Sequence, residues 1–445
     1  MHYIGKAIEY NIFNNLAPAM PKPGKGTEIV KTILSQASKE MREVLLPMAF
    51  PAMATRVKKA EFMYSDGKFH EMCGQMGHLI GSSGIGKQQL TYLIEAICRP
   101  LREHDQAEYQ RLVEWQRQIK KLSANKEKPE RPDVCFRFPP ADMTNAAFLQ
   151  NAMACEKAGE VAQNINLPEI EMADRICGGH RQVSQTVRNI YDCGRVGALR
   201  ATADGVTGNP VLRVNMSFTS TTEAARLFYK KDMTNGFFGR IPFAYKARGD
   251  RNGRIPRQGK YDEAFLEELE SYLARLDNCT GSFIVKPLNK VADLLAEEMA
   301  KIADLADDDT LWELSHRSIF AAWKKGAILW ILNNQTWTRS IGEFVIWFCY
   351  YDLWSKVQVF GDMFKGSGSL ADLEKKSGPK NMLDQLDTTF SEAQLEALRM
   401  SLDKSQSGTK HQLQVWKNRG FITHSNQTGL YSKTEEYLTG KSKSK

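Results

Sequence analysis

The chain has 445 residues, of which 42% are hydrophobic and 25% are charged, and its formal net charge is +8. This length exceeds one ordinary hydrophobic core and this composition excludes a disordered chain, so about two to four folded units are expected. Neither a secretory signal peptide nor a membrane span is predicted, because residues 319–330 contain two lysines and residues 341–354 are too few to cross a bilayer. We therefore expect a cytoplasmic protein with no membrane partner.

The first expected elements are a helical segment and a hairpin. Residues 1–60 are predicted to be an N-terminal helical segment, because apolar residues recur at helical spacing between Ile29 and Ala37. Strands are expected over residues 61–64 and 69–80, since Asp66-Gly67 between them favours a tight chain reversal. The second strand is expected to run directly into a glycine-rich segment.

That segment has the G-x-x-x-x-G-K spacing of a phosphate-binding loop. Its glycines let backbone N–H groups approach the phosphates of ATP, and Lys87 reaches the β and γ oxygens. A glycine turn that only happens to precede a lysine is the alternative interpretation. Gln88 occupies the position where serine or threonine normally binds Mg²⁺. The residues expected to contact the nucleotide are Gly81, Ser82, Ser83, Gly84, Ile85, Gly86, Lys87, Gln88 and Gln89.

An α/β core is predicted around this loop, over residues 61–260. After the loop, Leu90, Leu93, Ile94 and Ile97 recur at the spacing of an amphipathic helix. An exposed helical insertion is expected next, and three strands separated by helical stretches follow it. Such alternation favours a largely parallel sheet covered by helices. The insertion is assigned to residues 101–132 and the strands to residues 134–138, 161–167 and 211–219.

Two acids follow the second of these strands. A P-loop ATPase needs a carboxylate at the end of a neighbouring strand, to hold the metal's water shell and to orient the attacking water. Glu169 is the candidate catalytic residue, and Glu169 and Glu171 are the candidate Mg²⁺ ligands. Pro168 stands where another acid usually precedes them. Both glutamates are alternatively surface acids at the start of a helix.

Two further features are candidates for contact with the γ-phosphate. The hydroxyl cluster Thr219–Thr222 is either a phosphate sensor at a strand end or a group of solvated side chains. Arg240 follows two glycines that allow close backbone approach. It is predicted to act as a catalytic finger or sensor, in its own or a neighbouring subunit, or to form a structural ion pair.

Clustered positive charge predicts a DNA partner. Residues 246–260 hold six Lys or Arg against one acid, and the last 45 residues hold eight against three. Charge runs also occur on ordinary solvated surfaces, which is the alternative for each stretch. The residues predicted to contact nucleic acid are Arg200, Arg248, Arg251, Arg254, Lys410 and Lys417.

The remaining chain is assigned to two units. Residues 261–378 are predicted to be a helical domain without evident chemistry. Residues 379–445 are predicted to be a winged-helix-like domain with a basic tail, because two short helices precede a hairpin. Its second helix would turn Leu413 and Trp416 inward and offer polar side chains to DNA, although the same fold often serves only as a protein contact.

Eight cysteines are scattered along the chain without any Cys-x-x-Cys pair. Most of them have apolar neighbours in the sequence. We therefore predict small buried hydrophobic side chains in a reducing compartment.

The order of these motifs resembles a known family. It is similar to the P-loop ATPases of bacterial mobile elements and phages known as virulence-associated-protein-E-like proteins or primase-associated helicases, over about residues 60–440. The resemblance implies a RecA-like or AAA-like core, use of ATP and Mg²⁺, homo-oligomeric ring assembly and other mobile-element replication proteins as partners. It rests on residues 81–87, 166–169, 189–194, 211–222 and 236–240.

Three functional hypotheses follow from the sequence. The first is an ATP-dependent nucleic-acid motor or initiator, a helicase-like ATPase. The second is a DNA-binding regulator that binds nucleotide with little or no hydrolysis, which the residues at Gln88 and Pro168 favour. The third is a scaffold within a larger complex, which would bind neither ATP nor DNA.

Overall fold

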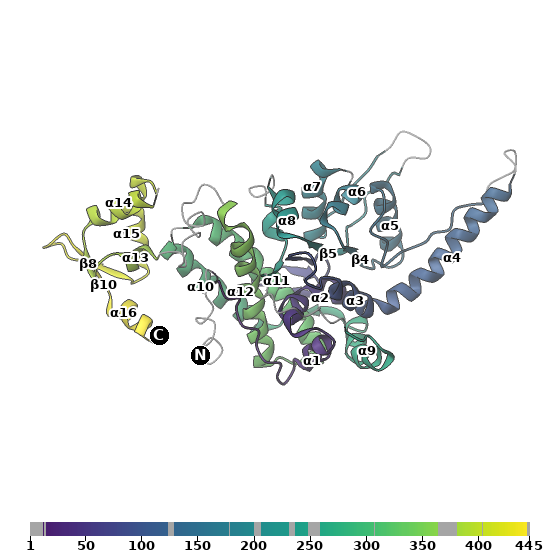
Figure 1. Ribbon diagram of the computed structural model, residues 1–445, viewed down its shortest axis with the longest axis horizontal. Coiled ribbons are helices and arrows are strands. Elements are labelled where there is room, and N and C mark those ends of the chain that lie inside the picture. Colours follow the sequence, from purple (N-terminus) through teal and green to yellow (C-terminus); the bar gives the residue numbers. More distant parts are fainter. Residues whose placement is uncertain are drawn as a thin grey trace. The chain divides into compact units, whose positions relative to one another are not determined.

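The computed structural model describes residues 12, 15–122, 129–177, 179–199, 206–230, 236–247, 259–306, 308–363, 381–402 and 404–442. The chain forms two compact units, and Figure 1 labels many of their helices and strands. One unit comprises Met20–Asn289 with Trp323–Phe344. The other comprises Met1–Ala19, Lys290–Ala322 and Val345–Lys445. The residues of the glycine loop belong to the first unit.

A four-stranded parallel sheet lies at the centre of the first unit, in the order β4-β5-β3-β6. Every side chain of β3 and β5 is buried, as expected for strands covered on both faces. The predicted α/β class with a parallel sheet is therefore confirmed. The strands are β3 (Met76–Gly81), β4 (Gln163–Leu167), β5 (Val214–Ser220) and β6 (Phe243–Lys246).

Helices cover the two faces of β3. The helix α2 (Arg42–Arg56) packs across β3, β5 and β6, and nearly all of its side chains are buried. A Cβ atom at Gly77 would lie 2.8 Å from Met48 Sδ, so glycine at this position allows α2 to approach the sheet closely. The next residue, His78, contacts Tyr229 of α8 (Thr222–Tyr229) on the opposite face, because side chains alternate along a strand.

The expected helix after the glycine loop is present as α3 (Gln88–Ile97). Its residues Leu90, Leu93, Ile94 and Ile97 are completely buried, which confirms the amphipathic pattern. A second helix, α4 (Arg99–Lys121), follows almost without a break and carries a proline in its first turn. The other helices of this unit are α1 (Glu28–Ser35), α5 (Asn145–Lys157), α6 (Ala173–Cys177), α7 (His180–Tyr191) and α9 (Glu263–Asp277).

A small second sheet contains the predicted hairpin. The strand β1 (Lys59–Met63) pairs antiparallel with β2 (Phe69–Glu71) and parallel with β7 (Thr280–Phe283). Gly67 in the turn has a φ of +78°, a left-handed value that glycine adopts without steric cost. The hairpin prediction is confirmed, including its Asp-Gly turn.

The expected continuation of β2 into the glycine loop is wrong. The strand β2 ends at Glu71, and β3 begins at Met76 in the other sheet. Between them, Gly74 has a φ of +74° and donates its N–H to Val214 O (3.1 Å). This residue turns the chain from one sheet into the other, within a segment that was predicted to be one strand.

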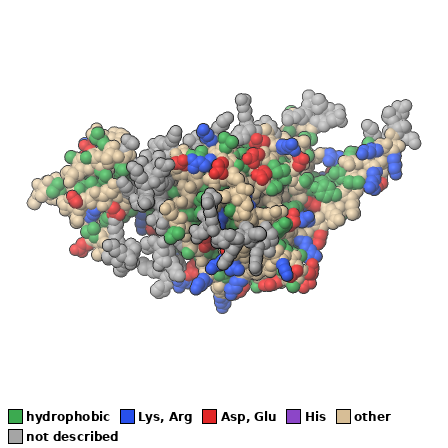
Figure 2. All heavy atoms as spheres, viewed as in Figure 1, with side chains coloured by type: hydrophobic (Ala, Val, Ile, Leu, Met, Phe, Trp, Pro, Cys, Tyr) green, Lys and Arg blue, Asp and Glu red, His purple; other side chains and the backbone are tan. Residues whose placement is uncertain are grey.

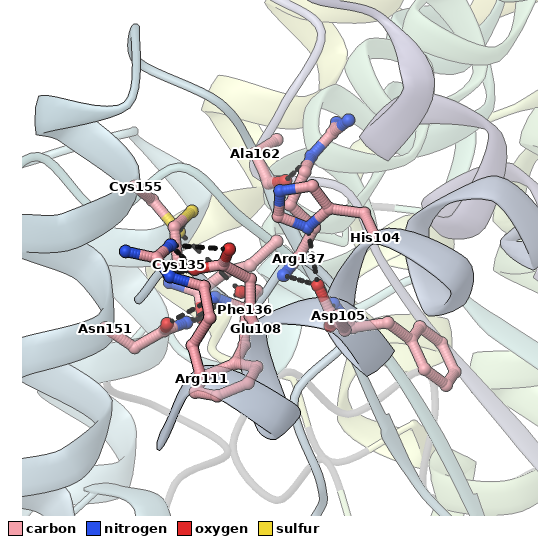
Figure 3. Close-up of polar contacts among 12 residues, drawn as sticks. His104, Asp105, Glu108, Arg111, Cys135, Phe136, Arg137, Asn151, Cys155 and Ala162 are labelled. Atoms are coloured by element: carbon pink, nitrogen blue, oxygen red, sulfur yellow. Dashed lines mark hydrogen bonds and ion pairs between the residues drawn. The ribbon is translucent and has the colours of Figure 1, made fainter. Parts of the chain in front are cut away.

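The predicted strand over residues 134–138 is also wrong. Side chains hold much of this backbone: Asp105 of α4 accepts the N–H of Arg137 (2.8 Å), and Asn151 of α5 bonds both the N–H and the O of Phe136 (2.8 Å each). Figure 3 shows these side chains converging on the segment. The strand β4 adds one backbone N–H to Arg137 O (2.8 Å). Side-chain partners therefore replace the ladder of a strand, and the segment supports the edge of β4.

The C-terminal part of the second unit has a core of its own. Its antiparallel sheet has the order β8-β10-β9, and Leu395, Leu413 and Trp416 are buried in one cluster with it. Among the residues described, none of the helices combines the length and apolarity that a bilayer crossing requires. Three long helices contribute residues to both units: α10 (Lys286–Ala306), α11 (Asp309–Leu332) and α12 (Arg339–Phe360). The C-terminal elements are α13 (Met382–Gln385), β8 (Thr389–Phe390), α14 (Glu392–Ser401), α15 (Thr409–Asn418), β9 (Ile422–His424), β10 (Tyr431–Lys433) and α16 (Glu435–Ser442).

Candidate nucleotide-binding site

The glycine loop connects β3 to α3 at the carboxyl edge of the parallel sheet. Gly84 and Gly86 have φ values of +78° and +90°, which favour glycine at both positions. A Cβ atom at Gly81 would clash with the Ile85 side chain and lie 3.2 Å from Lys246 O. The shape of the loop therefore requires its glycines. It also places the chain at the start of a helix, where the helix dipole favours an anion.

Lys87 closes the loop on itself. Its Nζ donates hydrogen bonds to Gly81 O (2.7 Å) and Ser82 O (3.3 Å). Burial lowers the pKa of Lys87, and the nearby carboxylates of Glu169 and Glu223 oppose that shift. Among the described contacts, this half-buried ammonium bonds only neutral carbonyl oxygens, so it would gain from an anion at the same place, because charged hydrogen bonds are stronger than neutral ones.

The two glutamines after Lys87 have different surroundings. Gln88 is exposed at the first position of α3. Gln89 is fully buried, and its side chain accepts the N–H of Ser38 (3.0 Å) and donates to Ser38 Oγ (3.3 Å). Gln89 therefore anchors the loop to the N-terminal segment, while only Gln88 presents its amide to solvent beside the loop.

The predicted acids lie at the end of β4. Glu169 follows Pro168, whose carbonyl accepts a hydrogen bond from Thr219 Oγ1 of β5 (2.5 Å). Both Glu169 and Glu171 are exposed, but only Glu169 is among the carboxylates whose charge acts on Lys87. The parallel sheet thus brings the charge of Glu169 near Lys87, although β5 lies between β4 and the strand that precedes the loop.

Sequence reasoning missed Glu223. This exposed acid lies in the first turn of α8, directly after β5, and its charge also acts on Lys87. Thr221 caps the helix by accepting the N–H of Ala224 (3.2 Å), which fixes the backbone around it. The signal was available: a Ser/Thr-rich strand end followed by an acid is a typical helix start. Its distance from residues 81–87 in the sequence concealed its place in the site.

Lys246 begins the basic stretch of residues 246–260 and lies beside the loop. Its Cα is paired with Gly81 in the register of β6 and β3, and Ile80 is paired with Ser220 in the register of β5 and β3. The ends of three neighbouring strands therefore meet at the glycine loop. Because β6 is only four residues long, no sequence pattern marked it as a strand of this sheet.

The side chain of His78 links β3 to the end of β5 and to α8. Its Nε2 lies 2.8 Å from Ser220 Oγ, and its Nδ1 lies 3.0 Å from the Tyr229 hydroxyl. Ser220 Oγ donates its proton to Thr221 O (2.9 Å), so Nε2 of His78 carries the proton between them and Nδ1 accepts from Tyr229. Complete burial, with the charge of Lys87 nearby, lowers the pKa of His78 to about 3. The ring is therefore a neutral connector.

Arg240 lies at the opposite edge of the sheet from the glycine loop. It ends the short turn η4 (Phe238–Arg240), before β6 begins, and β6 then rises about 10 Å to reach Lys246. Its guanidinium donates to Gly236 O (2.8 Å), lies 3.5 Å from Asp192 Oδ2 and stacks over the ring of Tyr191. The structure thus does not bring Arg240 to the loop of its own chain.

Two of the residues predicted to contact DNA can be described. Lys410 and Lys417 lie on α15, exposed along one face with Gln414. Leu413 and Trp416 are buried on the other side, as predicted. Over the face in view in Figure 2, basic and acidic side chains are interspersed. The other predicted contacts, Arg200, Arg248, Arg251 and Arg254, lie outside the described residues.

The opposite side of α15 is held within its own unit. Gln412 donates to Asp304 O (2.8 Å), and Arg419 forms an ion pair with the Asp304 carboxylate (2.6 Å). These contacts fix α15 against the end of α10 and leave the Lys410 face outward.

A scan against protein-family models and a search of curated proteins both found no match to this chain.

Proposed function

We propose that this chain is an ATP-dependent nucleic-acid motor or initiator, a P-loop ATPase with a RecA-like or AAA-like core and a C-terminal winged-helix-like domain. One observation carries the proposal: a G-x-x-x-x-G-K loop follows a buried parallel strand and leads into a helix, and the charges of Glu169 and Glu223 act on its lysine, Lys87. The proposed setting is replication or mobilisation of a mobile element, by virtue of the family resemblance described above.

Nucleotide binding would use the loop and its lysine. The triphosphate would replace the carbonyl partners of Lys87, which would move its ammonium from Gly81 O and Ser82 O to the β and γ oxygens. Mg²⁺, when bound, would neutralise charge on those phosphates. Glu169, Glu223 and Gln88 are exposed and have oxygen atoms suited to such a hard cation, although Gln88 replaces the usual hydroxyl residue after the lysine.

Hydrolysis would depend on the acids at the strand ends. Glu169 would orient the attacking water and accept its proton, because it follows β4 and the Thr219 hydrogen bond fixes the backbone carbonyl of Pro168 just before it. Glu223, whose charge also acts on Lys87, would help to hold the water shell. His78 would keep Ser220 and the start of α8 in place, as a positioning residue.

Arg240 would act only between subunits. It lies at the edge of the sheet where strands begin, so it can approach a γ-phosphate bound to a neighbouring copy but not one bound to its own chain. A catalytic arginine at this place therefore requires a homo-oligomer, such as a ring.

DNA contact would involve α15. The stripe of Lys410, Gln414 and Lys417 is outward-facing, has polar groups suited to phosphate or base edges, and is supported by a buried core on its other side. The hairpin of β9 and β10 would be the wing.

The first experiment compares DNA-stimulated ATP hydrolysis of the wild type, Lys87→Ala and the control Lys301→Ala, which removes an exposed lysine elsewhere. We expect Lys87→Ala to lose nucleotide binding and hydrolysis, and Lys301→Ala to match the wild type. Equal rates in the wild type and Lys87→Ala would end the proposal.

Binding without hydrolysis is the second candidate function. The exposed Gln88 at the metal position and Pro168 before Glu169 favour it, because both replace groups that ATP hydrolysis normally uses. In that case the wild type would bind ATP through Lys87 and bind DNA, yet would release phosphate no faster than Lys87→Ala.

Salt titration tests the DNA contact. Replacing Lys410 or Lys417 by alanine should weaken binding to any duplex and reduce the slope of log affinity against log salt by about one phosphate contact each. Lys301→Ala should leave the slope unchanged. An unchanged slope in both α15 variants would remove this helix from the interface.

A further inference from the structure

Two cysteines that are distant in sequence meet at the amino edge of the parallel sheet. Cys73, just before β3, has its Sγ 2.6 Å from Sγ of Cys193, in the connection between α7 and β5. Both are free thiols, and 120 positions separate them in the sequence. Cys193 adopts a φ of +46°, a left-handed value that is uncommon for a residue with a side chain. The fold thus holds the two sulfurs together through an unusual backbone turn.

The surroundings of this pair favour thiolate chemistry. Lys324 donates to the backbone O of Cys73 (2.7 Å), and Arg213 forms two hydrogen bonds to Glu71, whose Oε2 lies 3.2 Å from Cys73 Sγ. The hydrogen bond from Cys73 and the charges of Lys324 and Arg213 lower the pKa of the Cys193 thiol. A lowered pKa raises the fraction of the reactive thiolate at neutral pH.

The pair is also within reach of small reagents. Cys193 is partly exposed, and Cys73, Glu71 and Arg213 line a cavity of about 200 Å³. Cys135 and Cys155 also lie close together, with sulfurs 3.2 Å apart, but both are buried.

A metal ion is a poorer fit than a covalent bond. Glu71, Cys73 and Cys193 have three possible ligand atoms within 4.8 Å of one another. However, Arg213 occupies both carboxylate oxygens of Glu71, and Lys324 adds a second positive charge beside the sulfurs. A divalent cation would have to displace one of these contacts and approach two existing positive charges.

We propose that Cys73 and Cys193 form a reversible regulatory disulfide with hydrogen peroxide as the oxidant. The Cys193 thiolate attacks the O–O bond, taking one oxygen as sulfenic acid while the other leaves as hydroxide and is protonated to water. The Cys73 sulfur then attacks the sulfenic sulfur, forming the S–S bond and releasing a second water. In sum, two thiols and one peroxide give one disulfide and two waters, and a small dithiol reverses the reaction.

The bond would fasten the connection between α7 and β5 to the start of β3. Asp192, the neighbour of Cys193, is the ion-pair partner of Arg240 (3.5 Å), so the oxidised form would fix the backbone that positions Arg240. The disulfide itself does not depend on the proposed ATPase activity.

Peptide mapping of the full chain tests the assignment. Reduced protein is treated with hydrogen peroxide, alkylated, digested without reductant and analysed by mass spectrometry. We expect a peptide pair joining Cys73 to Cys193, lighter by two hydrogens than the two free peptides and separated by dithiothreitol. The melting temperature should rise on oxidation and return on reduction, since the cross-link restricts the unfolded chain.

Variants separate this pair from the other close thiols. Cys193→Ser and Cys73→Ser should lose both the linked peptide and the temperature rise, whereas Cys155→Ser should keep both. The wild-type map decides the question even where a serine variant does not fold. Two freely alkylated thiols after peroxide treatment, or one zinc ion retained per chain with both thiols protected, would overturn the proposal.

Discussion

The two edges of the parallel sheet contain similar residue types in opposite arrangements. At the carboxyl edge, Lys87 bonds only backbone carbonyls, and Glu169 and Glu223 act on it through space without a direct ion pair to it among the described contacts. At the amino edge, Arg213 is paired with Glu71, and Arg240 lies beside Asp192. Among the described contacts, Lys87, Glu169 and Glu223 at the carboxyl edge thus have no direct ion-pair partner, whereas Arg213 and Arg240 at the amino edge are paired.

This difference follows from strand direction. Parallel strands all end at one edge, where the loops into the next helices begin and where helix N-termini point. Polar groups there face solvent and one another. At the other edge the chain re-enters the sheet, and the side chain of Arg213 forms an ion pair with Glu71 there. A charged residue therefore has a different meaning depending on which end of a strand it follows.

The largest expected effect tests whether Arg240, at the amino edge, is catalytic or only structural. If Arg240 acts on the nucleotide of a neighbouring subunit, Arg240→Ala should reduce DNA-stimulated hydrolysis by about 10³-fold with ATP binding retained. An equal mixture of Arg240→Ala and Lys87→Ala should regain part of the wild-type rate, because each supplies what the other lacks. If Arg240 is only structural, the variant would lose stability, hydrolysis per folded chain would stay unchanged, and mixing would restore nothing.

A smaller effect is expected from the acids at the carboxyl edge. Glu169→Gln keeps the shape of the side chain but removes the base, so hydrolysis should fall by about 10²-fold while ATP affinity is kept. Glu171→Gln is the matched control, since its charge is not among those acting on Lys87. Steady-state rates and fluorescent-nucleotide binding measure the two quantities. Loss of activity in Glu171→Gln alone would reassign the functional acid.

The smallest expected effect concerns His78, which lies between the two edges. Burial lowers its pKa from 6.5 to about 3, so the unfolded chain binds more protons between these pH values. Stability should therefore fall as the pH drops below about 6.5, by about 2 kcal/mol at pH 5 from this group. Urea unfolding at pH 7 and pH 5 should show a weaker pH dependence in His78→Gln.

The control for this prediction is His424→Gln, which changes an exposed histidine of β9. It should keep the wild-type difference between the two pH values. An equal pH dependence in the wild type and His78→Gln would mean that His78 does not titrate with unfolding.

Local sequence signals were sufficient where the structure is itself local. The amphipathic spacing of Leu90 to Ile97 predicted α3, the Asp66-Gly67 pair predicted the hairpin turn, and alternating helical and strand patterns predicted the parallel sheet. They were insufficient where a short break or a side chain intervened. Gly74 divided one predicted strand between two sheets, and Asp105 and Asn151 took over the backbone of another.

The sequence by itself therefore determined the glycine loop and the helix that follows it, because their conformations depend on neighbouring residues. Only the tertiary structure decided that Glu223 lies near Lys87, that Arg240 lies at the far edge, and that Cys73 contacts Cys193. Those positions depend on strand order and register, which arise when distant segments bury apolar surface against each other. No pattern within one segment records which strand becomes its neighbour.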